Sequence, residues 1–449
     1  MAKVIKKYSL FINLIIFSYL LPSSSSALDI IRDTELEQYT AEIMSILLSS
    51  TNYETEELEV YFVKSDQINA FVTGGKNIFI NTELIIEADD YREYAAVLAH
   101  ELAHIQGGHI FNTSIELNNL SDKALPIYLL GIIGIIAGSA ETGLAGVMVG
   151  QASVSDGFTY YSRTQEAAAD QAAVKILCQN GIDGNYLISF LNKLQRMEFN
   201  KNSEKKNYRS THPLTENRIT WINSSLRNGT SCNFKIDHVM QKRFELLKAK
   251  LHGFTHPYSE TIAIYSTNND IDLYAKAVAS YFQGEHLVSI ENLNELIEND
   301  PNNPFYRELI GEIYFANSNF EEAAYYQKTA IGKLKNENDL YYMMIGNYLL
   351  SIDDIEKTKE GIEFLKKSIH INPKNSYSWY LLAKAYAKNN EIAKANYATA
   401  ERYFLIGERL LSYDFALKAV KNVEEYSPEW YRSSDLIEIL KKEVSTKKD

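Results

Sequence analysis

The residues most able to do chemistry form the string His100-Glu101-Leu102-Ala103-His104. On a helix, positions i and i+4 lie on the same face, so both imidazoles can reach one metal ion. Glu101 lies beside them and can take a proton from a water at that ion. The flank Ala95–Ala99 is too apolar for a solvated surface helix. The string therefore predicts a zinc site with two histidine ligands and a glutamate as general base.

Two histidines leave a tetrahedral zinc ion short of a third protein ligand. His109 follows His104 by five residues, whereas the H-E-x-x-H-x-x-G-x-x-H pattern needs six, so we interpret His109 as a non-ligand. A downstream helical acid is the other source of a ligand. Glu166 and Asp170 share a face of the expected helix Thr164–Gln179, and alanines between them allow close helix packing. We expect Glu166 to bind zinc and Asp170 to accept a hydrogen bond from a zinc-bound imidazole.

The elements that must position these residues are short strands and helices with regular apolar spacing. The expected strands are Leu58–Val63 and Ile78–Asn81, and the expected helices are Leu36–Leu48, Asp89–Gln106 and Thr164–Gln179. Gly107-Gly108 ends the helix that carries the two histidines. Arg163 and Tyr161 directly precede the second site helix, and we expect them to orient Glu166.

The last stretch of about 190 residues repeats with a period of about 34–37 residues. The equivalent small and aromatic positions are Ala277, Gly284 and Leu293; Ile310, Gly311, Tyr314, Ala323 and Ala330; Gly346 with Pro373; and Trp379, Leu382, Tyr386 and Ala395. This pattern is typical of tetratricopeptide repeats. Small residues let two helices pack closely, and several pairs must stack to bury their apolar faces. The pattern predicts an all-α solenoid with a concave protein-binding surface, and it becomes irregular after Ala400, as at a capping end.

The N-terminus has the three parts of a secretory signal peptide. Lys3, Lys6 and Lys7 precede the apolar run Ser9–Leu21, and the small residues Ser23–Ala27 follow Pro22. The run has about 13 residues, short of the ~20 that a spanning helix needs, so we prefer a cleaved peptide to a retained membrane anchor. The sequence predicts removal of residues 1–27 and export of the remaining chain.

Charge and cysteine content exclude several classes of protein. The chain has 45 Lys+Arg against 58 Asp+Glu and a net charge of −13, which argues against general nucleic-acid binding. Its two cysteines, Cys178 and Cys232, exclude a disulfide scaffold, and whether they pair stays open. The Gly- and Ala-rich segment Ala124–Gly150 is either a loop pair that touches membrane or unfolded substrate, or a buried hairpin.

These strings resemble the HtpX-like and CAAX-prenyl-protease-type zinc endopeptidases, most closely the periplasmic two-domain branch of β-barrel assembly-enhancing proteases. The matching strings are Ile68–Phe71, Gly74–Thr82, Val97–His104, Tyr161–Arg163 through Glu166 and Asp170, and Thr211–Arg218. They occur in the family's order and are followed by tetratricopeptide repeats. Thr164–Ala168 departs from the more charged sequence of many relatives, but the Glu/Asp spacing is intact.

The resemblance implies zinc on His100, His104 and Glu166, one ion per chain, with Glu101 as general base. It also implies that His212 faces the metal. There, a histidine either supports the oxyanion of the reaction or binds zinc as a fourth ligand and holds the enzyme off. The family further places the strand Asn69–Phe71 along the cleft, where Asn69 and Phe71 would contact a paired substrate strand.

We therefore expect a mainly α protein with a zincin-like α+β metallopeptidase domain (28–252), which contains a small sheet, and a tetratricopeptide solenoid (258–443). The expected function is a periplasmic zinc endopeptidase of a Gram-negative host that degrades or processes misassembled outer-membrane proteins. The repeats would dock unfolded clients or the outer-membrane β-barrel assembly machinery, and residues 124–150 would make any peripheral membrane contact. The alternative is an assembly scaffold with a mostly latent peptidase core. Client identity, cleavage preference and oligomeric state do not follow from the sequence.

Overall fold

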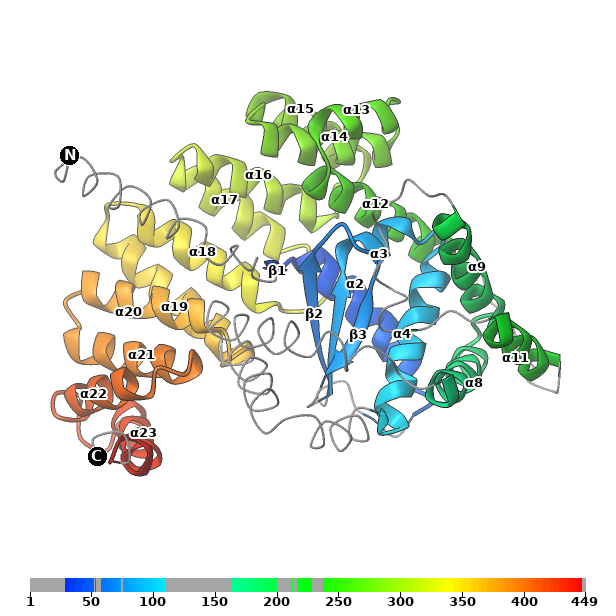
Figure 1. The fold of residues 1–449 in the computed structure, drawn as a ribbon. Coiled ribbons are helices and arrows are strands. Elements are labelled where there is room, and N and C mark those ends of the chain that lie inside the picture. Colours follow the sequence, from blue (N-terminus) through cyan, green and yellow to red (C-terminus); the bar gives the residue numbers. More distant parts are fainter. Residues whose placement is uncertain are drawn as a thin grey trace, which may run out of the picture.

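The computed structural model describes residues 29–51, 53, 58–73, 76–109, 163–199, 212, 216–227 and 237–445. The predicted signal peptide (1–27) and the segment 124–150 lie outside these residues. Figure 1 shows a unit with a small sheet followed by a long row of helices. The predicted fold class, a small sheet with helices followed by all-α repeats, is thereby confirmed. Among the described helices, none is both long and apolar enough to cross a membrane.

The sheet has four strands in the order β1-β2-β4-β3. The strands are β1 (Asp29–Ile31), β2 (Glu59–Lys64), β3 (Ala70–Thr73) and β4 (Asn77–Asn81). β4 pairs parallel with β2 and antiparallel with β3. Every residue of β4 is buried, because its alternating side chains are covered on both faces. β3 ends the sheet on the side that approaches the helix with the two histidines.

That helix, α4 (Tyr91–Gln106), lies in the centre of the core. It begins where the Asp90 carboxylate accepts a hydrogen bond from the backbone N–H of Arg92, and it ends at Gly107. His100, Glu101 and His104 are all 0% exposed. Polar groups buried this deeply must find compensating partners within the protein.

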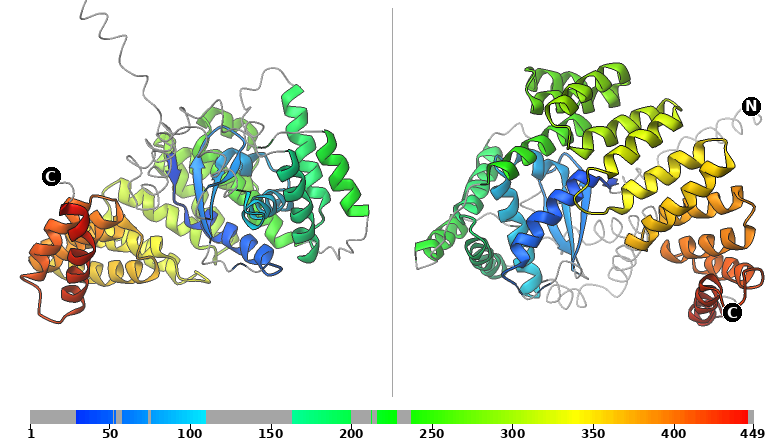
Figure 2. Two further views of the ribbon diagram at one scale, coloured as in Figure 1. Left: turned by 60° about the horizontal axis from the view of Figure 1, so that its bottom comes forward. Right: turned by 180° about the vertical axis from the view of Figure 1, so that it is seen from behind.

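Five other helices share the core with α4, and all of them except α3 pack directly against it. They are α2 (Thr34–Leu48), α3 (Thr82–Glu87), α8 (Arg163–Gln179), α9 (Asn185–Phe199) and α12 (His238–Thr255). Figures 1 and 2 show α4 between the sheet and α8. Ala169 and Ala173 of α8 are fully buried, and their small side chains allow α8 to lie close to α4. A further helix, α11 (Glu216–Arg227), packs against α8 and α9.

The second part of the chain is a row of helix pairs that begins after the short helix α13 (Tyr258–Ile264). The pairs are α14 (Asp270–Gln283) with α15 (His286–Asn299), α16 (Pro304–Ala316) with α17 (Phe320–Ile331), α18 (Asp339–Ser351) with α19 (Ile355–Ile371), α20 (Ser376–Lys388) with α21 (Ile392–Leu405), and α22 (Arg409–Val420) with α23 (Pro428–Ser445). A Cβ on Gly346 would lie 2.5 Å from Leu365 Cγ, so only glycine lets α18 approach α19 this closely. α22 and α23 form a regular pair beyond Ala400, where the sequence pattern weakens.

Helix α12 joins the two parts because its opposite faces belong to different cores. Phe244 and Leu247 pack in the core around α4, whereas Leu246 packs in the first repeat core. The start of α2 also contacts the repeats directly. Thr34 Oγ1 donates to Glu308 Oε2 at 2.5 Å, and Tyr274 OH donates to Glu35 Oε2 at 2.7 Å. Helix α12 thus contributes to both parts of the chain, and the expected boundary at residues 252–258 stays a prediction.

Candidate active site

Three predicted ligands converge at one point between α4 and α8. His100 Nε2 lies 3.0 Å from His104 Nε2, and Glu166 Oε1 lies 3.3 Å from His104 Nε2. The other carboxylate oxygen, Glu166 Oε2, is 3.6 Å from His100 Nε2. Zinc–nitrogen and zinc–oxygen bonds of about 2.0–2.1 Å in a tetrahedron separate two ligand atoms by about 3.3 Å. The three side chains thus have the spacing of ligands around one zinc ion.

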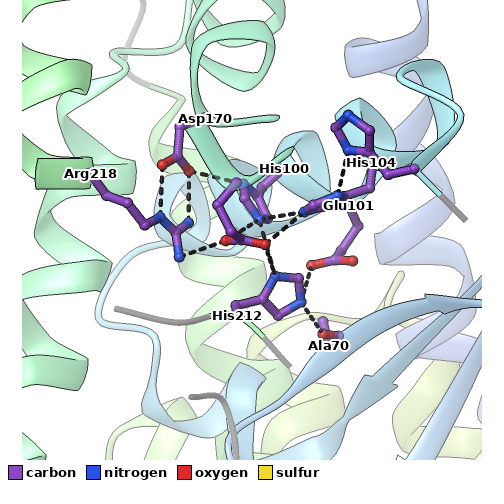
Figure 3. A network of polar contacts seen from close by, with 9 residues as sticks. Ala70, His100, Glu101, His104, Asp170, His212 and Arg218 are labelled. Atoms are coloured by element: carbon purple, nitrogen blue, oxygen red, sulfur yellow. Dashed lines mark hydrogen bonds and ion pairs between the residues drawn. The ribbon is translucent and has the colours of Figure 1, made fainter. Parts of the chain in front are cut away.

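His212 completes this group from a different part of the chain. Its Nδ1 lies 3.0 Å from Glu166 Oε1 and 3.3 Å from His100 Nε2 (Figure 3). Its Nε2 lies 3.2 Å from the backbone oxygen of Ala70, which can only accept a hydrogen bond. The proton of a neutral His212 is thereby fixed on Nε2, and the Nδ1 lone pair faces the three other ligands. The four residues together could hold one metal ion.

Lone pairs that converge this closely repel one another unless a proton or a metal cation lies between them. All four side chains are 0–1% exposed, so water cannot screen that repulsion. The donor set of three imidazole nitrogens and a carboxylate is one that zinc prefers. The buried donors and their spacing therefore fit the implied metal.

Asp170 and Arg218 fix the orientation of the ligands. Asp170 Oδ1 lies 3.1 Å from His100 Nδ1, on the opposite side of the ring from the ligand atom. Burial alone would raise the pKa of Asp170, but hydrogen bonds from Arg218 and His100 outweigh it and lower the pKa. The ionised carboxylate holds the His100 proton on Nδ1, so Nε2 faces His104 and His212, where it could bind a metal.

Arg218, at the start of α11, bridges the two acids of α8. Its Nη1 is 2.7 Å from Glu166 Oε2, and its Nη2 and Nε lie 2.7 and 2.8 Å from the two oxygens of Asp170. It is 1% exposed and belongs to the largest fully buried side chains. Sequence reasoning included Arg218 in the resembling string but gave it no role in the site.

The structure does not bring Arg163 to Glu166. Arg163 is exposed in the first turn of α8, and among the described residues the ion pairs of Glu166 are with His100, His104, His212 and Arg218. An arginine side chain is buried only where it pairs with a buried acid. Arg218, not Arg163, is the arginine that pairs with Glu166. Tyr161 lies outside the described residues.

Glu101 is the polar group best placed to move a proton. Both of its carboxylate oxygens are buried without a hydrogen-bond partner within the described residues. The nearest titratable nitrogen, His212 Nε2, lies 3.4 Å from Oε1. Burial raises the pKa of Glu101, although the charges of His212 and His100 oppose that rise. A raised pKa makes this carboxylate a stronger base than one in water.

His109 lies behind His104, away from the ligand atoms. Its Nδ1 is 2.8 Å from His104 Nδ1, and it is not among the residues that could share the metal. A Cβ on Gly107 would lie 2.5 Å from His109 Nε2, so the glycine after α4 lets this ring fold back. His109 therefore supports His104, in keeping with its interpretation as a non-ligand.

The predicted substrate strand runs past the metal ligands. Asn69 is buried, and its backbone oxygen accepts a hydrogen bond from the Asn81 N–H at 2.9 Å. Phe71 is half-buried and stacks on Phe79 of β4, with ring centroids 5.2 Å apart. Ala70, between them, is the residue that His212 contacts. The end strand of the sheet and the metal ligands thus form one continuous site.

Comparison with known protein families identifies both parts of the chain. Residues 31–225 match the profile of peptidase family M48, and residues 364–397 match that of a tetratricopeptide repeat. Residues 31–225 form an M48 peptidase domain. All four converging side chains of the M48 domain lie in the matched range, and the chain is a metalloprotease followed by tetratricopeptide repeats, as the sequence predicts.

Some relatives match this chain across both the peptidase domain and the repeats. The chain is 25% identical over 398 residues to the β-barrel assembly-enhancing protease of Escherichia coli K12, with 84% of this chain and 77% of that protein covered. The Yersinia pestis protein of the same name is 25% identical over 395 residues, with 84% and 78% covered. Bovine mitochondrial metalloendopeptidase OMA1 is 28% identical over 193 residues, which cover 39% of this chain and 34% of that protein.

Cys178 of α8 is 5% exposed and disulfide-bonded. The other cysteine of the sequence, Cys232, lies outside the described residues.

Two arginines near Glu166 allow a matched test of the buried ion network. Arg218→Gln removes the partner of two buried carboxylates and should lower the free energy of unfolding of the metal-free protein by about 3–5 kcal/mol. Arg163→Gln changes an exposed side chain and should alter it by less than about 0.5 kcal/mol. Urea denaturation followed by circular dichroism measures both. Equal effects of the two substitutions would contradict the assignment of Arg218.

Proposed function

We propose that this chain is a zinc-dependent endopeptidase of the periplasm that removes or processes misassembled outer-membrane proteins. The observation that carries the proposal is the convergence of His100, His104 and Glu166 with Glu101 directly beside them. A zinc ion bound there would polarise a peptide carbonyl and lower the pKa of a water at the metal. The buried donor set supports zinc as the ion, because two or three imidazoles with one carboxylate are typical of catalytic zinc sites.

Each side chain around this point would have a separate role in the reaction. Glu101 would accept a proton from the water that attacks the peptide carbonyl and return it to the leaving amine. Asp170 and Arg218 would keep the ligands oriented while charge develops. Their burial excludes water, which strengthens each of these interactions.

The end of the sheet supports binding of substrate in an extended form. β3 is paired with β4 on one side, and its other side faces the metal ligands through Ala70 and His212. An extended peptide that adds to β3 would hydrogen-bond through its backbone, irrespective of its sequence. Such binding requires an unfolded or partly unfolded segment, which suits a protease of misassembled proteins.

The client class and the compartment are inferred from the relatives. Two relatives that share 84% of this chain are β-barrel assembly-enhancing proteases. The signal-peptide pattern of residues 1–27 supports export, and the repeats supply a surface for protein partners. We infer that the repeats dock unfolded barrel proteins or the β-barrel assembly machinery.

One observation favours the alternative function, an assembly scaffold whose peptidase is mostly latent. His212 Nδ1 lies among the ligand atoms, and His212 Nε2 is bonded to the strand that a substrate would use. A histidine in this position would compete with both the reacting water and the substrate. The two functions differ in whether peptide cleavage is needed for the biological effect.

Glu101→Gln separates the two functions. The substitution keeps the shape of the side chain but removes the base, so cleavage of an unfolded outer-membrane barrel protein should fall at least about 100-fold. The variant should also fail to restore a deletion strain. Glu321→Gln, an exposed glutamate of α17, serves as the control and should behave like the wild type. Full restoration by Glu101→Gln, together with no cleavage by the wild type when zinc is supplied, would establish the scaffold.

His212→Ala tests which role His212 has. Because His212 Nδ1 lies among the ligands, we expect its removal to speed cleavage of the same barrel protein. If the site is open roughly a tenth of the time in the wild type, the gain is about tenfold. A loss of turnover would assign His212 to support of the oxyanion instead, and unchanged turnover would reject both roles.

A further inference from the structure

A second cluster of metal-binding side chains lies at the junction of the peptidase domain and the repeats. His252 is in the last turn of α12, His256 follows the end of that helix, and Glu260 is in the first turn of α13. One potential ligand atom from each residue lies within 4.8 Å of the other two. The cluster is separate in sequence and structure from the four residues of the active site.

Two threonines determine which nitrogen of each ring can bind a metal. Thr255 Oγ1 donates its proton to the Leu251 backbone oxygen at 2.8 Å, so it accepts from His256 Nδ1, which lies 2.9 Å away. Thr261 Oγ1 donates in the same way to the Pro257 backbone oxygen at 3.3 Å and lies 3.1 Å from His252 Nδ1. When neutral, both imidazoles carry their proton on Nδ1.

The metal-binding lone pair of both histidines is therefore on Nε2. A ligand histidine usually has its other nitrogen fixed by a hydrogen bond of this kind. The two rings are stacked face to face, with centroids 4.0 Å apart and planes at 10°, so their Nε2 lone pairs lie in nearly parallel planes. A tilt about χ2, a torsion with a broad minimum, would bring the lone pairs to a common point.

Two carboxylates lie close to the rings. Glu83 of α3 is 1% exposed, and its Oε2 lies 3.8 Å from His256 Nε2. Glu260 is exposed and belongs to the same cluster of potential ligands. Imidazole nitrogens together with a carboxylate oxygen form a donor set that zinc accepts.

We propose that His252, His256 and Glu260 bind a second zinc ion, with the buried carboxylate of Glu83 near the metal-binding nitrogen of His256. Two imidazoles with a carboxylate favour zinc over magnesium or calcium, which prefer oxygen ligands alone. The ion would connect α12, whose faces belong to both cores, with α13 at the start of the repeats. It would thereby stiffen the junction between the peptidase domain and the repeats, independently of catalysis.

The test is the zinc stoichiometry of the tag-free full chain after equilibrium dialysis at micromolar zinc. The wild type should bind two ions. His256→Asn and Glu260→Gln should each bind one with full affinity, and His100→Asn/His104→Asn should also retain one. Combining His256→Asn with His100→Asn/His104→Asn should abolish binding.

The matched control is His370→Asn, an exposed histidine of α19, which should bind two ions like the wild type. Glu260 is exposed, so folding of its variant is not at stake, and far-UV circular dichroism checks the others. One ion in the wild type, or two ions in both His256→Asn and Glu260→Gln, would overturn the proposal. Because peptidase activity is not the readout, the test stands apart from the function proposed for the active site.

Discussion

The active site depends on burying three carboxylates, three imidazoles and one guanidinium where water cannot screen them. An isolated charge is costly in this core, so the other groups pair with one another, whereas burial raises the pKa of Glu101, which has no hydrogen-bond partner among the described residues. The pKa of Glu166 shows this balance: burial would raise it, but His212, His100 and His104 together bring it well below its usual range. Arg218 forms ion pairs with both Glu166 and Asp170. Folding of the core therefore requires these two carboxylates to take the orientation that the site needs.

The same network links the metal ligands to the place where substrate would bind. His212 contacts Glu166 through one ring nitrogen and the β3 backbone through the other, and it also lies near Glu101. A single side chain therefore contacts the proposed ligand Glu166, the proposed general base Glu101 and the end strand of the sheet. A peptide that pairs with β3 would compete with His212 for the Ala70 carbonyl, so under our proposal binding of substrate would be coupled to release of His212.

The sequence predicted the local part of this arrangement because helix periodicity fixes which residues share a face. That argument placed His100 with His104, and Glu166 with Asp170, on two helices that the structure brings together. It did not identify Arg218, since a partner from a third helix depends on tertiary packing. We expected Arg163 to orient Glu166 only because the two residues are close in sequence. Likewise α22 and α23 form a helix pair although their repeat pattern is weak, because packing against α21 supplies what the sequence signal lacks.

The most direct measurement is the zinc dissociation constant of the active site in Glu166→Gln and Glu101→Gln, determined by competition with a chelator. Both substitutions neutralise a buried acid in the same site, but only Glu166 lies among the potential ligand atoms. Glu166→Gln should weaken binding by at least about 100-fold, whereas Glu101→Gln should leave it within about threefold of the wild type. Unweakened zinc binding by Glu166→Gln would contradict the account.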